Sequence, residues 1–432
     1  MTTPNAYPMS QTIRTIGILG GGQLGMMLAQ AAIPLGYQCV FLEYNAACPA
    51  SLYGRVFSSE QLEDFIAAAD VFTLEFENTP TATVEQLARL SANGSKQGMF
   101  PPPIALEIAQ DRLKEKQMFN ELDIATVPFM AVSSQAELQQ ARDTLGLPIV
   151  LKTSRGGYDG KGQFVIKHDS DIKAAWQALK DAVSGKGSLT PTPAPLIAEG
   201  FIHFSREVSI IAARAPDGQV RCYDLVENHH HQGILAKTQA PAVGTSQLFQ
   251  QATNAITTVM NRLDYVGVMA LELFVTKDER GNDCLLANEI APRVHNSGHW
   301  SIEGAITSQF ENHIRAVVGL PLGDTDNVHP SIMINVLGQY PDINAVLAID
   351  GSHYHSYHKG ERNDRKIAHI TLMPNDVADL EPALARLIAV LPNKVGLDKI
   401  SPAVNDKATI SAETVSQSAD GQQSVSDAKV EH

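Results

Sequence analysis

The hydrophobic residues of this chain fall into short blocks separated by glycine, proline and polar segments. Residues 15–20 (TIGILG) form an apolar, β-branched run, 26–36 (MMLAQAAIPLG) predict a helix, and 37–43 and 70–77 predict further strands. Strands that alternate with helices at this spacing predict a parallel sheet with right-handed crossovers. The first region of the chain is therefore expected to be an α/β domain.

The next region mixes predicted strands with helical pieces. Strands are predicted over 147–153, 162–167, 195–201 and 207–214, and the Gly/Ser/Pro/Thr-rich residues 181–195 predict an exposed loop. Three prolines and a helix near 100–112 are typical of a domain boundary in front of this region.

The last part of the chain supplies buried strands and then a polar end. Residues 265–276 and 284–300 predict two strands, the second of which continues into a polar loop. A third region opens at 331–338 and ends with a strand at 366–373 and a helix over LEPALARLIAVLP. Beyond about residue 403 the chain is rich in Ser, Ala, Gln and Asp, which predicts a disordered tail.

Composition and charge exclude several classes of protein. The chain has 432 residues, 44% of them hydrophobic, which indicates two or three domains with a sizeable core. With Lys+Arg 33 against Asp+Glu 47, the net charge of −14 disfavours a nucleic-acid or anionic-membrane partner. Four scattered cysteines, no leader-like N-terminus and no run of about 18 apolar residues predict a cytoplasmic protein.

The segment GGGQLG places Gly20, Gly22 and Gly25 in GxGxxG order between a predicted strand and a predicted helix. Such a turn presents free N–H groups to an anion. Glu43, at the end of the next strand, stands where an NAD enzyme has its ribose-binding acid. Dinucleotide binding, a mononucleotide phosphate site and a purely structural close-packed turn all remain open for this motif.

A second glycine-rich segment contains charged residues that can bind phosphates. IVLKTSRGGYDGKGQ places Lys152 on a strand before a loop that carries Asp159 and Lys161, without the pattern of a P-loop. A strand-borne lysine offers a fixed charge to phosphates, and the loop can close over them. A plain glycine-rich hairpin is the alternative. Downstream, the backbone from Glu199 to Ile202 can offer hydrogen bonds to an adenine edge, and Glu207 can bind ribose hydroxyls.

Two acids interrupt apolar strands near the middle of the chain. Glu272 lies in LELF and Glu289 in ANEIAPR, where an uncompensated carboxylate is costly. Carboxylates on neighbouring strands can share Mg²⁺, which prefers oxygen ligands and bridges triphosphate oxygens. Salt-bridged core acids are the alternative.

Polar residues follow these acids in the segment PRVHNSGHW (292–300). Arg293 offers a fork for a carboxylate or phosphate, and His295 can relay a proton. The basic run at 358–369 is either a solvated face or a phosphate clamp. The three histidines of ENHHHQG (227–233) alternate faces on a strand, so one of them near a nucleotide is favoured over a metal site.

Taken together, GGGQLG, RGGYDGKGQ, AEGF…SREVS, HQGI, YVGVMALELF and NEIAPRVHNSGHW resemble the N5-carboxyaminoimidazole ribonucleotide synthase family, ATP-grasp enzymes of purine biosynthesis. The resemblance covers roughly residues 14–400. It implies a Rossmann-like pre-ATP-grasp α/β domain, an ATP-grasp domain of mixed α/β and α+β character, and a small C-terminal domain. The boundaries expected are 1–105, 106–330 (with a mobile lid at about 125–200), 331–402 and a tail at 403–432.

The resemblance also implies a set of site residues. For ATP they are Arg112, Lys152, Gly157, Tyr158, Asp159, Gly160, Lys161, Gly162, Gln163, Glu199, Gly200, Phe201, Ile202, Glu207, His230, Asn288 and Glu289. For Mg²⁺, with Mn²⁺ as an alternative, they are Glu272 and Glu289. For the ribonucleotide they are Gln23, Leu24, Glu75, Asn296, Ser297, Lys359, Arg365 and Lys366. The catalytic set is Arg293, His295, Asp159 and Lys161.

The chemistry implied by the resemblance is the ATP-dependent carboxylation of aminoimidazole ribonucleotide with bicarbonate, by way of carboxyphosphate, in a homodimer. Arg293 and His295 are expected to hold the labile intermediate while Asp159 and Lys161 orient the ring. Rival readings are formate-dependent glycinamide ribonucleotide formyltransferase, a biotin carboxylase, an NAD-dependent oxidoreductase and a nucleotide-binding regulator without turnover.

Overall fold

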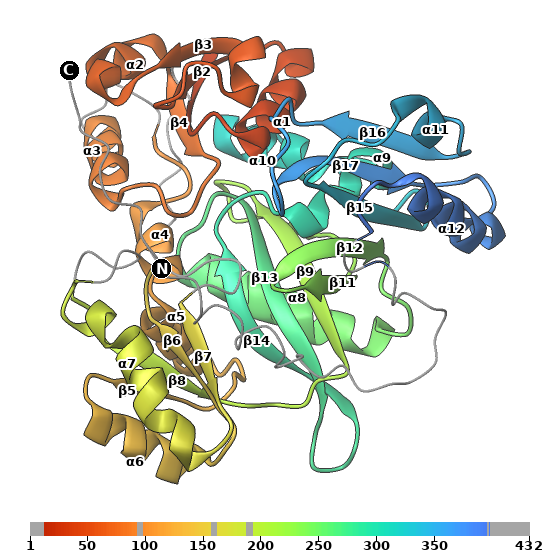
Figure 1. Ribbon diagram of the computed structural model, residues 1–432. Helices are drawn as coiled ribbons and strands as arrows, with labels where there is room; N and C mark the ends of the chain where they lie inside the picture. The colour runs from red at the N-terminus through yellow and green to blue at the C-terminus, as the bar shows by residue number, and fades with distance from the viewer. Residues whose placement is uncertain (1–12, 93–97, 157–161, 187–192, 395–396, 398–432) are drawn as a thin grey trace, which may run out of the picture.

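The computed structural model describes residues 13–92, 98–156, 162–186, 193–394 and 397, and Figure 1 shows their arrangement around three sheets. The expected tail at 403–432 and the loop residues Gly157 to Lys161 lie outside the described residues. Within the described part, no helix combines the length and apolar character needed to cross a bilayer.

The N-terminal domain is a parallel sheet with the strand order β3-β2-β1-β4. Its strands are β1 Thr15–Leu19, β2 Gln38–Leu42, β3 Gly54–Phe57 and β4 Val71–Leu74. Its helices are α1 Gln23–Ala32, α2 Leu62–Ala68 and α3 Thr81–Ala92, with 3₁₀ turns at Ile33–Leu35, Pro49–Leu52 and Ser59–Gln61. The predicted parallel α/β character is confirmed. Helix α1 begins earlier than predicted, at Gln23, and β4 ends earlier, because the chain turns after Leu74.

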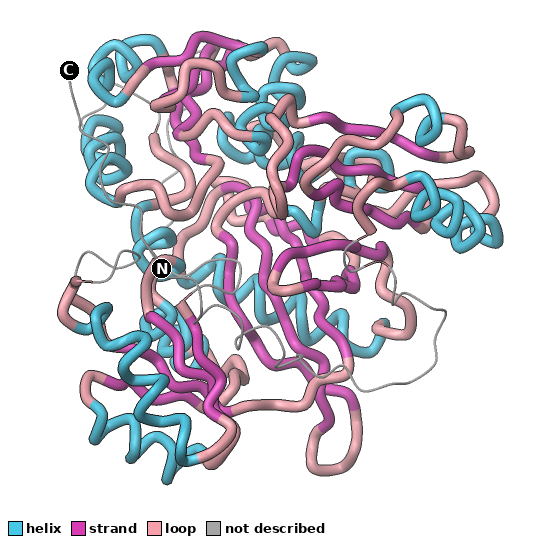
Figure 2. The backbone as a smooth tube through the Cα atoms, in the orientation of Figure 1, coloured by secondary structure: helices cyan, strands magenta, loops and turns pink. Residues whose placement is uncertain are grey.

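A small subdomain follows the linking helices α4 Pro103–Ala109 and α5 Arg112–Glu121. It contains an antiparallel sheet with the order β5-β8-β6-β7. The elements are β5 Phe129–Val132, α6 Gln135–Leu145, β6 Ile149–Thr153, β7 Gln163–Ile166, a 3₁₀ turn Asp169–Asp171, α7 Ile172–Val183 and β8 Leu196–Gly200. Figure 2 shows α6 and α7 on one face of this sheet. The loop predicted from residue 181 begins after Val183, where α7 ends.

The largest sheet has nine strands and joins the middle of the chain to its C-terminal part. Its main path is β14-β13-β9-β11-β12-β15-β17-β16, with β10 paired to β9. Its strands are β9 Arg206–Arg214, β10 Val220–Cys222, β11 Val226–His231, β12 Ile234–Ala240, β13 Gly267–Lys277, β14 Asp283–Ala291, β15 Ser331–Leu337, β16 Ser352–Ser356 and β17 Lys366–Leu372. The region expected from residue 331 therefore continues the same sheet through β12 and β15.

Helices and short turns complete this part of the molecule. They are α8 Ser246–Arg262, α9 Ser301–Gly304, α10 Gln309–Val318, α11 Ile343–Leu347 and α12 Leu380–Val390, with 3₁₀ turns at Asn296–Gly298 and Val377–Asp379. The strand predicted over 284–300 ends at Ala291, and the polar loop begins there.

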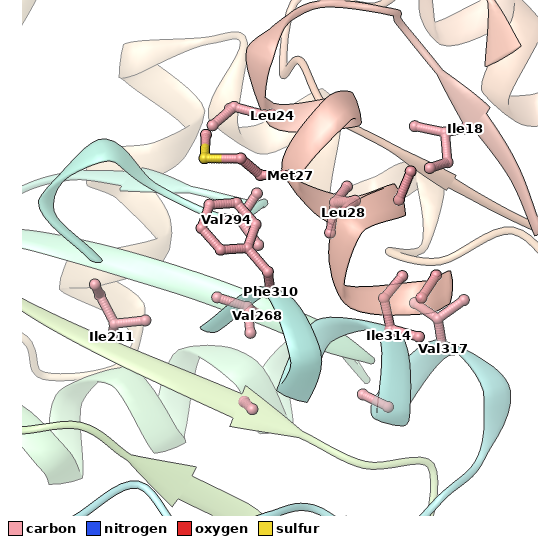
Figure 3. Packing of buried hydrophobic residues seen from close by; sticks show 14 of the residues in the cluster. Ile18, Leu24, Met27, Leu28, Ile211, Val268, Val294, Phe310, Ile314 and Val317 are labelled. Atoms are coloured by element: carbon pink, nitrogen blue, oxygen red, sulfur yellow. The ribbon is translucent and has the colours of Figure 1, made fainter. Parts of the chain in front are cut away.

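One hydrophobic core joins the N-terminal domain to the large sheet. Leu28 of α1 packs in the same buried cluster as Ile314 and Val317 of α10, and Val268 of β13 belongs to it as well (Figure 3). Burial of this apolar surface, at about 25 cal/mol per Å², fixes α1 beside α10. The glycine-rich turn that precedes α1 is thereby held near the polar loop that follows β14.

Candidate active site

The two acids predicted as metal ligands face each other. Glu272 of β13 and Glu289 of β14 are direct partners in the antiparallel register, so their side chains share one face of the sheet. The register shifts just beyond this pair, because Leu273 pairs with Ala287 and Asn288 is the extra residue of a β-bulge. Two carboxylates at one point of the sheet form an oxygen-rich site suited to a hard divalent cation.

The electrostatics of this pair favour a cation. Burial favours the neutral form of Glu272, but the hydrogen bond and charge of His295, with further positive charge from His230, lower its pKa to about 2. Burial, and then the negative charge of Glu272, raise the pKa of Glu289. The Glu289 side chain is exposed to solvent, although the surrounding protein still disfavours its charged form. A divalent ion between the two acids would relieve their repulsion.

Helix α5 covers the outer edge of β14 with two consecutive buried polar side chains, and burial together with the charge of Glu289 raises the pKa of Glu115 well above its usual range. The Glu115 carboxylate accepts a hydrogen bond from the Ile290 N–H (2.7 Å), and the Lys116 ammonium donates to the Asn288 carbonyl (3.4 Å). β14 is an edge strand, and the Asn288 carbonyl and Ile290 N–H would otherwise be left without these partners. Glu115 and Lys116 of α5 therefore hold the bulge beside Glu289 through hydrogen bonds to its backbone.

The same lysine reaches the small subdomain. Lys116 Nζ lies 3.2 Å from Glu199 Oε1, and Lys152 Nζ lies 2.6 Å from Glu199 Oε2. Burial disfavours the charged carboxylate, yet the two lysines together lower the pKa of Glu199 to about 2. Glu199 is thus a buried anion that orients Lys152, whose side chain is 23% exposed. The sequence pointed to Lys152 and Glu199 but missed Lys116, whose only signal was its place one helical turn after Arg112.

The C-terminal end of β8 leaves one backbone donor open. The N–H groups of Gly200 and Phe201 donate to the carbonyls of Pro128 (2.8 Å) and Pro148 (3.2 Å). Among the described residues the Ile202 N–H has no hydrogen-bond partner. The amide of Ile202, two residues beyond the end of β8, is therefore the donor of this segment that a base can use.

Arg112 and Gln163 both lie beside the C-terminal end of β6. Asp111 caps α5 by accepting from the Leu113 N–H (3.1 Å), and the Arg112 guanidinium donates to the Thr153 carbonyl (3.2 Å), so Arg112 lies beside the end of β6. Gln163 begins β7 opposite Lys152, and Gly162 precedes it with φ 75°, in the left-handed region.

A second acid–base contact lies on β9 and β11. His230 Nδ1 is 2.6 Å from Glu207 Oε2. Burial lowers the pKa of His230, but Glu207 outweighs burial and the net pKa is raised. The neighbouring His229 has its pKa lowered to about 4, first by burial. The strand carries a bulge between these two histidines. No cluster of three or more His, Cys, Asp or Glu side chains placed to hold a metal ion occurs in the described part of the chain.

The loop after β14 is tied to Glu272 and to the N-terminal domain. His295 Nε2 lies 3.1 Å from Glu272 Oε1, and its Nδ1 lies 2.8 Å from the Ser297 hydroxyl. The Arg293 guanidinium forms a two-pronged ion pair with Glu77, one arm of which measures 2.8 Å. A further N–H of Arg293 donates to the Val294 carbonyl (3.0 Å). The remaining guanidinium donors are those that a bound anion could meet.

Glu77 was not among the predicted site residues. Its contact with Arg293 spans 216 positions of sequence, and its only signal was its place two residues after Glu75 in the segment LEFEN. Burial favours neutral Glu77, but Arg293 lowers the pKa of this carboxyl.

The glycine-rich turn is closed by an acid of the protein itself. Glu75 accepts hydrogen bonds from the N–H groups of Gly22 (2.5 Å) and Gly25 (2.7 Å). Gly20 has φ 100°, and a side chain there would collide with Glu75. A side chain of the protein already occupies these helix N-terminal amides. Of the three interpretations of this motif, the structural turn is therefore favoured over a phosphate site of a dinucleotide or mononucleotide.

Several predicted ribonucleotide contacts meet at this turn. The Lys359 ammonium donates to the Gln23 side-chain oxygen, and its charge acts on Glu75. The Leu24 side chain is buried in the shared core, so that any substrate contact of this residue is through its backbone. Arg365 donates to the Gly360 carbonyl (3.2 Å), and Lys366 begins β17 close enough for its charge to act on His230 and His299.

Asn296 and Ser297 follow His295 in the loop. The Ser297 side chain is buried against His295. The Asn296 side-chain oxygen is buried and has no hydrogen-bond partner in the described part of the chain. A buried amide oxygen without a partner is costly unless a ligand supplies a donor.

A partly exposed lysine held by a buried acid, paired acids on adjacent strands and a small antiparallel subdomain beside a larger sheet define an ATP-grasp enzyme. Models of the ATP-grasp domain, the ribonucleotide synthetase preATP-grasp domain and the phosphoribosylaminoimidazole carboxylase C-terminal domain match residues 117–310, 13–110 and 331–382. The chain is 44% identical over 381 residues to N5-carboxyaminoimidazole ribonucleotide synthase of Pseudomonas aeruginosa, covering 87% of this chain and 99% of that protein. It belongs to the N5-carboxyaminoimidazole ribonucleotide synthase family.

Solved structures agree with this assignment. The crystal structure of the synthetase from Thermus thermophilus has a TM-score of 0.78 and 42% sequence identity, and the match covers 88% of this chain and 99% of that chain. The synthase of Aspergillus clavatus, solved with ADP and 5-aminoimidazole ribonucleotide, has a TM-score of 0.76 at 29% identity, covering 88% and 98%. The expected fold class, with three domains in this order, is confirmed.

Proposed function

We propose that this protein carboxylates 5-aminoimidazole ribonucleotide with bicarbonate, using ATP and releasing ADP and phosphate, as a step of purine biosynthesis. Membership of the synthase family supports this reaction class. The single structural observation that supports it most strongly is the direct pairing of Glu272 and Glu289 beside Lys152 and the Arg293 loop. A nucleotide site and an anion-holding loop therefore converge on one pair of acids.

Glu272 and Glu289 fit Mg²⁺, with Mn²⁺ as an alternative, because both offer hard oxygen donors from one face of the sheet. When bound there with ATP, the ion supplies charge neutralisation on the triphosphate. The two carboxylates cannot fill the coordination sphere of the ion by themselves. This suits Mg²⁺, which takes its other ligands from phosphate and water. His295, bonded to Glu272, holds that carboxylate in its ionised form.

Lys152 and Arg112 are the cations proposed to face the ATP phosphates. The Glu199–Ile202 segment is proposed to bind the adenine, and Glu207 with His230 the ribose. The 157–163 segment, including Tyr158, Gly160 and Lys161, is proposed to close over the phosphates through its N–H groups. Lys152 carries the strongest support, because Glu199 fixes its ammonium at 2.6 Å.

The chemistry proceeds in two steps. A bicarbonate oxygen attacks the γ-phosphorus, the β–γ bridging bond breaks, and carboxyphosphate and ADP form. The exocyclic amine of the ribonucleotide then attacks the carboxyl carbon, or carbon dioxide released from it. Phosphate departs and accepts the amine proton. Arg293 and His295 are proposed to hold the carboxyphosphate while Asp159 and Lys161 orient the ring, and closure of the 157–163 loop is proposed to exclude water.

The ribonucleotide phosphate is proposed to bind Lys359, Arg365 and Lys366, which are concentrated at one end of the C-terminal strands. Lys359 contacts Gln23, and its charge acts on Glu75. Asn296 and Ser297, in the loop after β14, are proposed to contact the same ribonucleotide. The Asn296 side-chain oxygen has no hydrogen-bond partner among the described residues, which supports the proposal that a substrate group, such as a ribose hydroxyl or the amine, donates a hydrogen bond to it. Since Glu75 occupies the glycine-turn amides, the phosphate is proposed to bind the basic run instead.

We further propose a homodimer in the cytoplasm. Large apolar side chains on the N-terminal domain support association, because Tyr44 is 90% exposed and Leu52 is 65% exposed. Four free thiols support a reducing compartment. Light scattering coupled to gel filtration tests the assembly, and a monomeric mass at micromolar concentration would contradict it.

The activity is tested by incubating the protein with MgATP, aminoimidazole ribonucleotide and labelled bicarbonate. We expect equal amounts of ADP, phosphate and acid-labile fixed carbon, and no fixed carbon when the ribonucleotide is omitted. Formate in place of bicarbonate serves as the control for the formyltransferase alternative. Turnover that depends on formate and ignores bicarbonate would overturn the proposal.

A further inference from the structure

Gln309, the first residue of α10, holds both backbone groups of His295. Its side-chain oxygen accepts a hydrogen bond from the His295 N–H (2.9 Å), and its side-chain nitrogen donates to the His295 carbonyl (2.7 Å). The Gln309 side chain is fully buried. It therefore cannot reach substrate, but it fixes the chain at the residue that contacts Glu272.

The same amide closes the turn that follows His295. The Gln309 side-chain nitrogen lies 3.2 Å from His299 Nδ1. Gly298 packs so tightly that a side chain there would come within 2.6 Å of the Gln309 oxygen. The Ser301 hydroxyl accepts from the Gln309 N–H (3.0 Å) and donates to the Gly298 carbonyl (2.6 Å). Helix α10 thus fixes the 295–299 segment through one side chain.

The position of the His295 ring depends on this support. Its two ring nitrogens contact Glu272 (3.1 Å) and Ser297 (2.8 Å), and both partners lie beside or within the same short loop. Because a side chain follows its backbone, movement of the His295 peptide would move the ring away from Glu272. Groups that must meet a reacting atom tolerate little displacement, since an error of about 1 Å can cost about a hundredfold in rate.

We propose that Gln309 is a positioning residue for carboxylation, acting through the backbone of His295. This inference rests on the proposed function, in which His295 holds carboxyphosphate beside the amine. When the loop is held, the intermediate passes its carboxyl group to the amine. When the loop is loose, water attacks instead and returns bicarbonate and phosphate, so that ATP is consumed without fixing carbon.

The chain provides a matched control three residues along the same helix. The Asn312 side-chain oxygen accepts from the Gly323 N–H (2.8 Å), and its nitrogen donates to the Gly323 carbonyl (3.4 Å). Asn312 is also fully buried. It makes the same kind of two-sided amide clamp, but on a loop away from Glu272 and His295. A general loss of packing on α10 affects both residues, whereas a positioning role belongs to Gln309 alone.

The experiment compares Gln309→Glu with Asn312→Asp. Each change keeps the acceptor and replaces the donor with a carboxylate oxygen. This oxygen faces the His295 carbonyl in Gln309→Glu, and the Gly323 carbonyl and Tyr223 hydroxyl in Asn312→Asp. For both variants we measure ADP formed per carbon fixed, kcat, the KM for ATP and the melting temperature. We expect Gln309→Glu to raise the ratio of ADP to fixed carbon by about tenfold, with an unchanged KM for ATP. Asn312→Asp should keep the ratio of ADP to fixed carbon of the natural protein, at a melting temperature similar to that of Gln309→Glu.

Equal ratios in the two variants would overturn the positioning role, provided that the natural protein fixes carbon. If the natural protein fixes none, the proposed function itself fails. Gln309→Met, which lacks both hydrogen bonds, provides a second variant. Should neither Gln309 variant fold, amide hydrogen exchange in the natural protein decides: slow exchange at His295 supports the clamp, and exchange as fast as at an exposed loop amide overturns it.

Discussion

Lys116 on α5 lies 3.2 Å from Glu199 on β8, and this contact joins the helix that supports Glu289 to the sheet that carries Lys152. Both side chains are almost wholly buried. Glu199 therefore has two cationic partners, of which only Lys152 keeps contact with solvent. The negative charge of Glu199 is shared, and Lys152 retains positive potential toward the place proposed for the ATP phosphates.

Replacing Lys116 should weaken ATP binding although Lys116 does not face the nucleotide. In Lys116→Met, Glu199 would depend on Lys152 alone, so the free energy that Lys152 can offer to phosphate falls. We expect the dissociation constant for ATP, measured by calorimetry, to rise by about tenfold. Lys114→Met is the control, because Lys114 forms an exposed ion pair with Glu107 on the same helix. Unchanged ATP affinity in Lys116→Met would contradict the shared-charge account.

The affinity for the ribonucleotide should depend on the protonation of Lys359. Burial lowers the pKa of Lys359 to about 8, although Glu75 opposes the shift. Lys359 is charged below this pH and neutral above it, so its attraction for a phosphate is lost as the pH rises. We expect kcat/KM for aminoimidazole ribonucleotide to fall as the pH rises through about 8, with no matching change in the KM for ATP.

Lys359→Arg provides the control for this pH dependence, because arginine stays protonated throughout the range. The decline near pH 8 should disappear in the arginine variant. A decline that persists there would assign the titration to another group.

Stability should fall in mild acid because of a buried histidine between two domains. His313 accepts a hydrogen bond from the Val268 N–H at Nδ1 (3.0 Å) and contacts the Thr73 hydroxyl through Nε2 (2.7 Å). Burial lowers its pKa to about 4, from 6.5. Between these values the unfolded chain binds a proton that the folded chain refuses, so stability is full above about pH 6.5 and declines toward pH 4.

From pH 7.5 to pH 5 this single residue should remove about 2 kcal/mol from the free energy of unfolding. Urea unfolding at the two pH values measures the loss. His313→Gln serves as the control, because it keeps every other titrating group of the natural protein. The variant should lose about 2 kcal/mol less than the natural protein. Equal losses would show that His313 does not carry the effect.

Local patterns in the sequence were enough to predict much of the fold. The apolar blocks around β1, β2, β6 and β13 are continuous and bounded by glycine or polar residues, so their periodicity is readable without knowing their partners. Glu272 and Glu289 could be recognised for the same reason, since a carboxylate within an apolar strand is locally anomalous. That the two are direct partners follows from strand register, which single strands do not reveal.

The supporting residues could not be predicted because their roles depend on contacts distant in sequence. Glu77 meets Arg293 across 216 positions and Lys116 meets the Asn288 carbonyl across 172. Gln309 lies in an ordinary amphipathic helix, and nothing in its neighbourhood separates its clamp on His295 from a surface glutamine. The occupation of the glycine turn by Glu75 likewise appears only when β4 is placed beside β1.

The central claim is that Glu272 and Glu289 together hold the divalent ion that allows ATP to activate bicarbonate. Its most direct test is Mg²⁺-dependent ADP formation by Glu289→Gln, beside Glu279→Gln in the exposed turn after β13 as a control. The account predicts that Glu289→Gln folds with an unchanged circular dichroism spectrum and loses ADP formation by at least about a thousandfold, while Glu279→Gln keeps it. ADP formation near the natural rate in Glu289→Gln would contradict the claim.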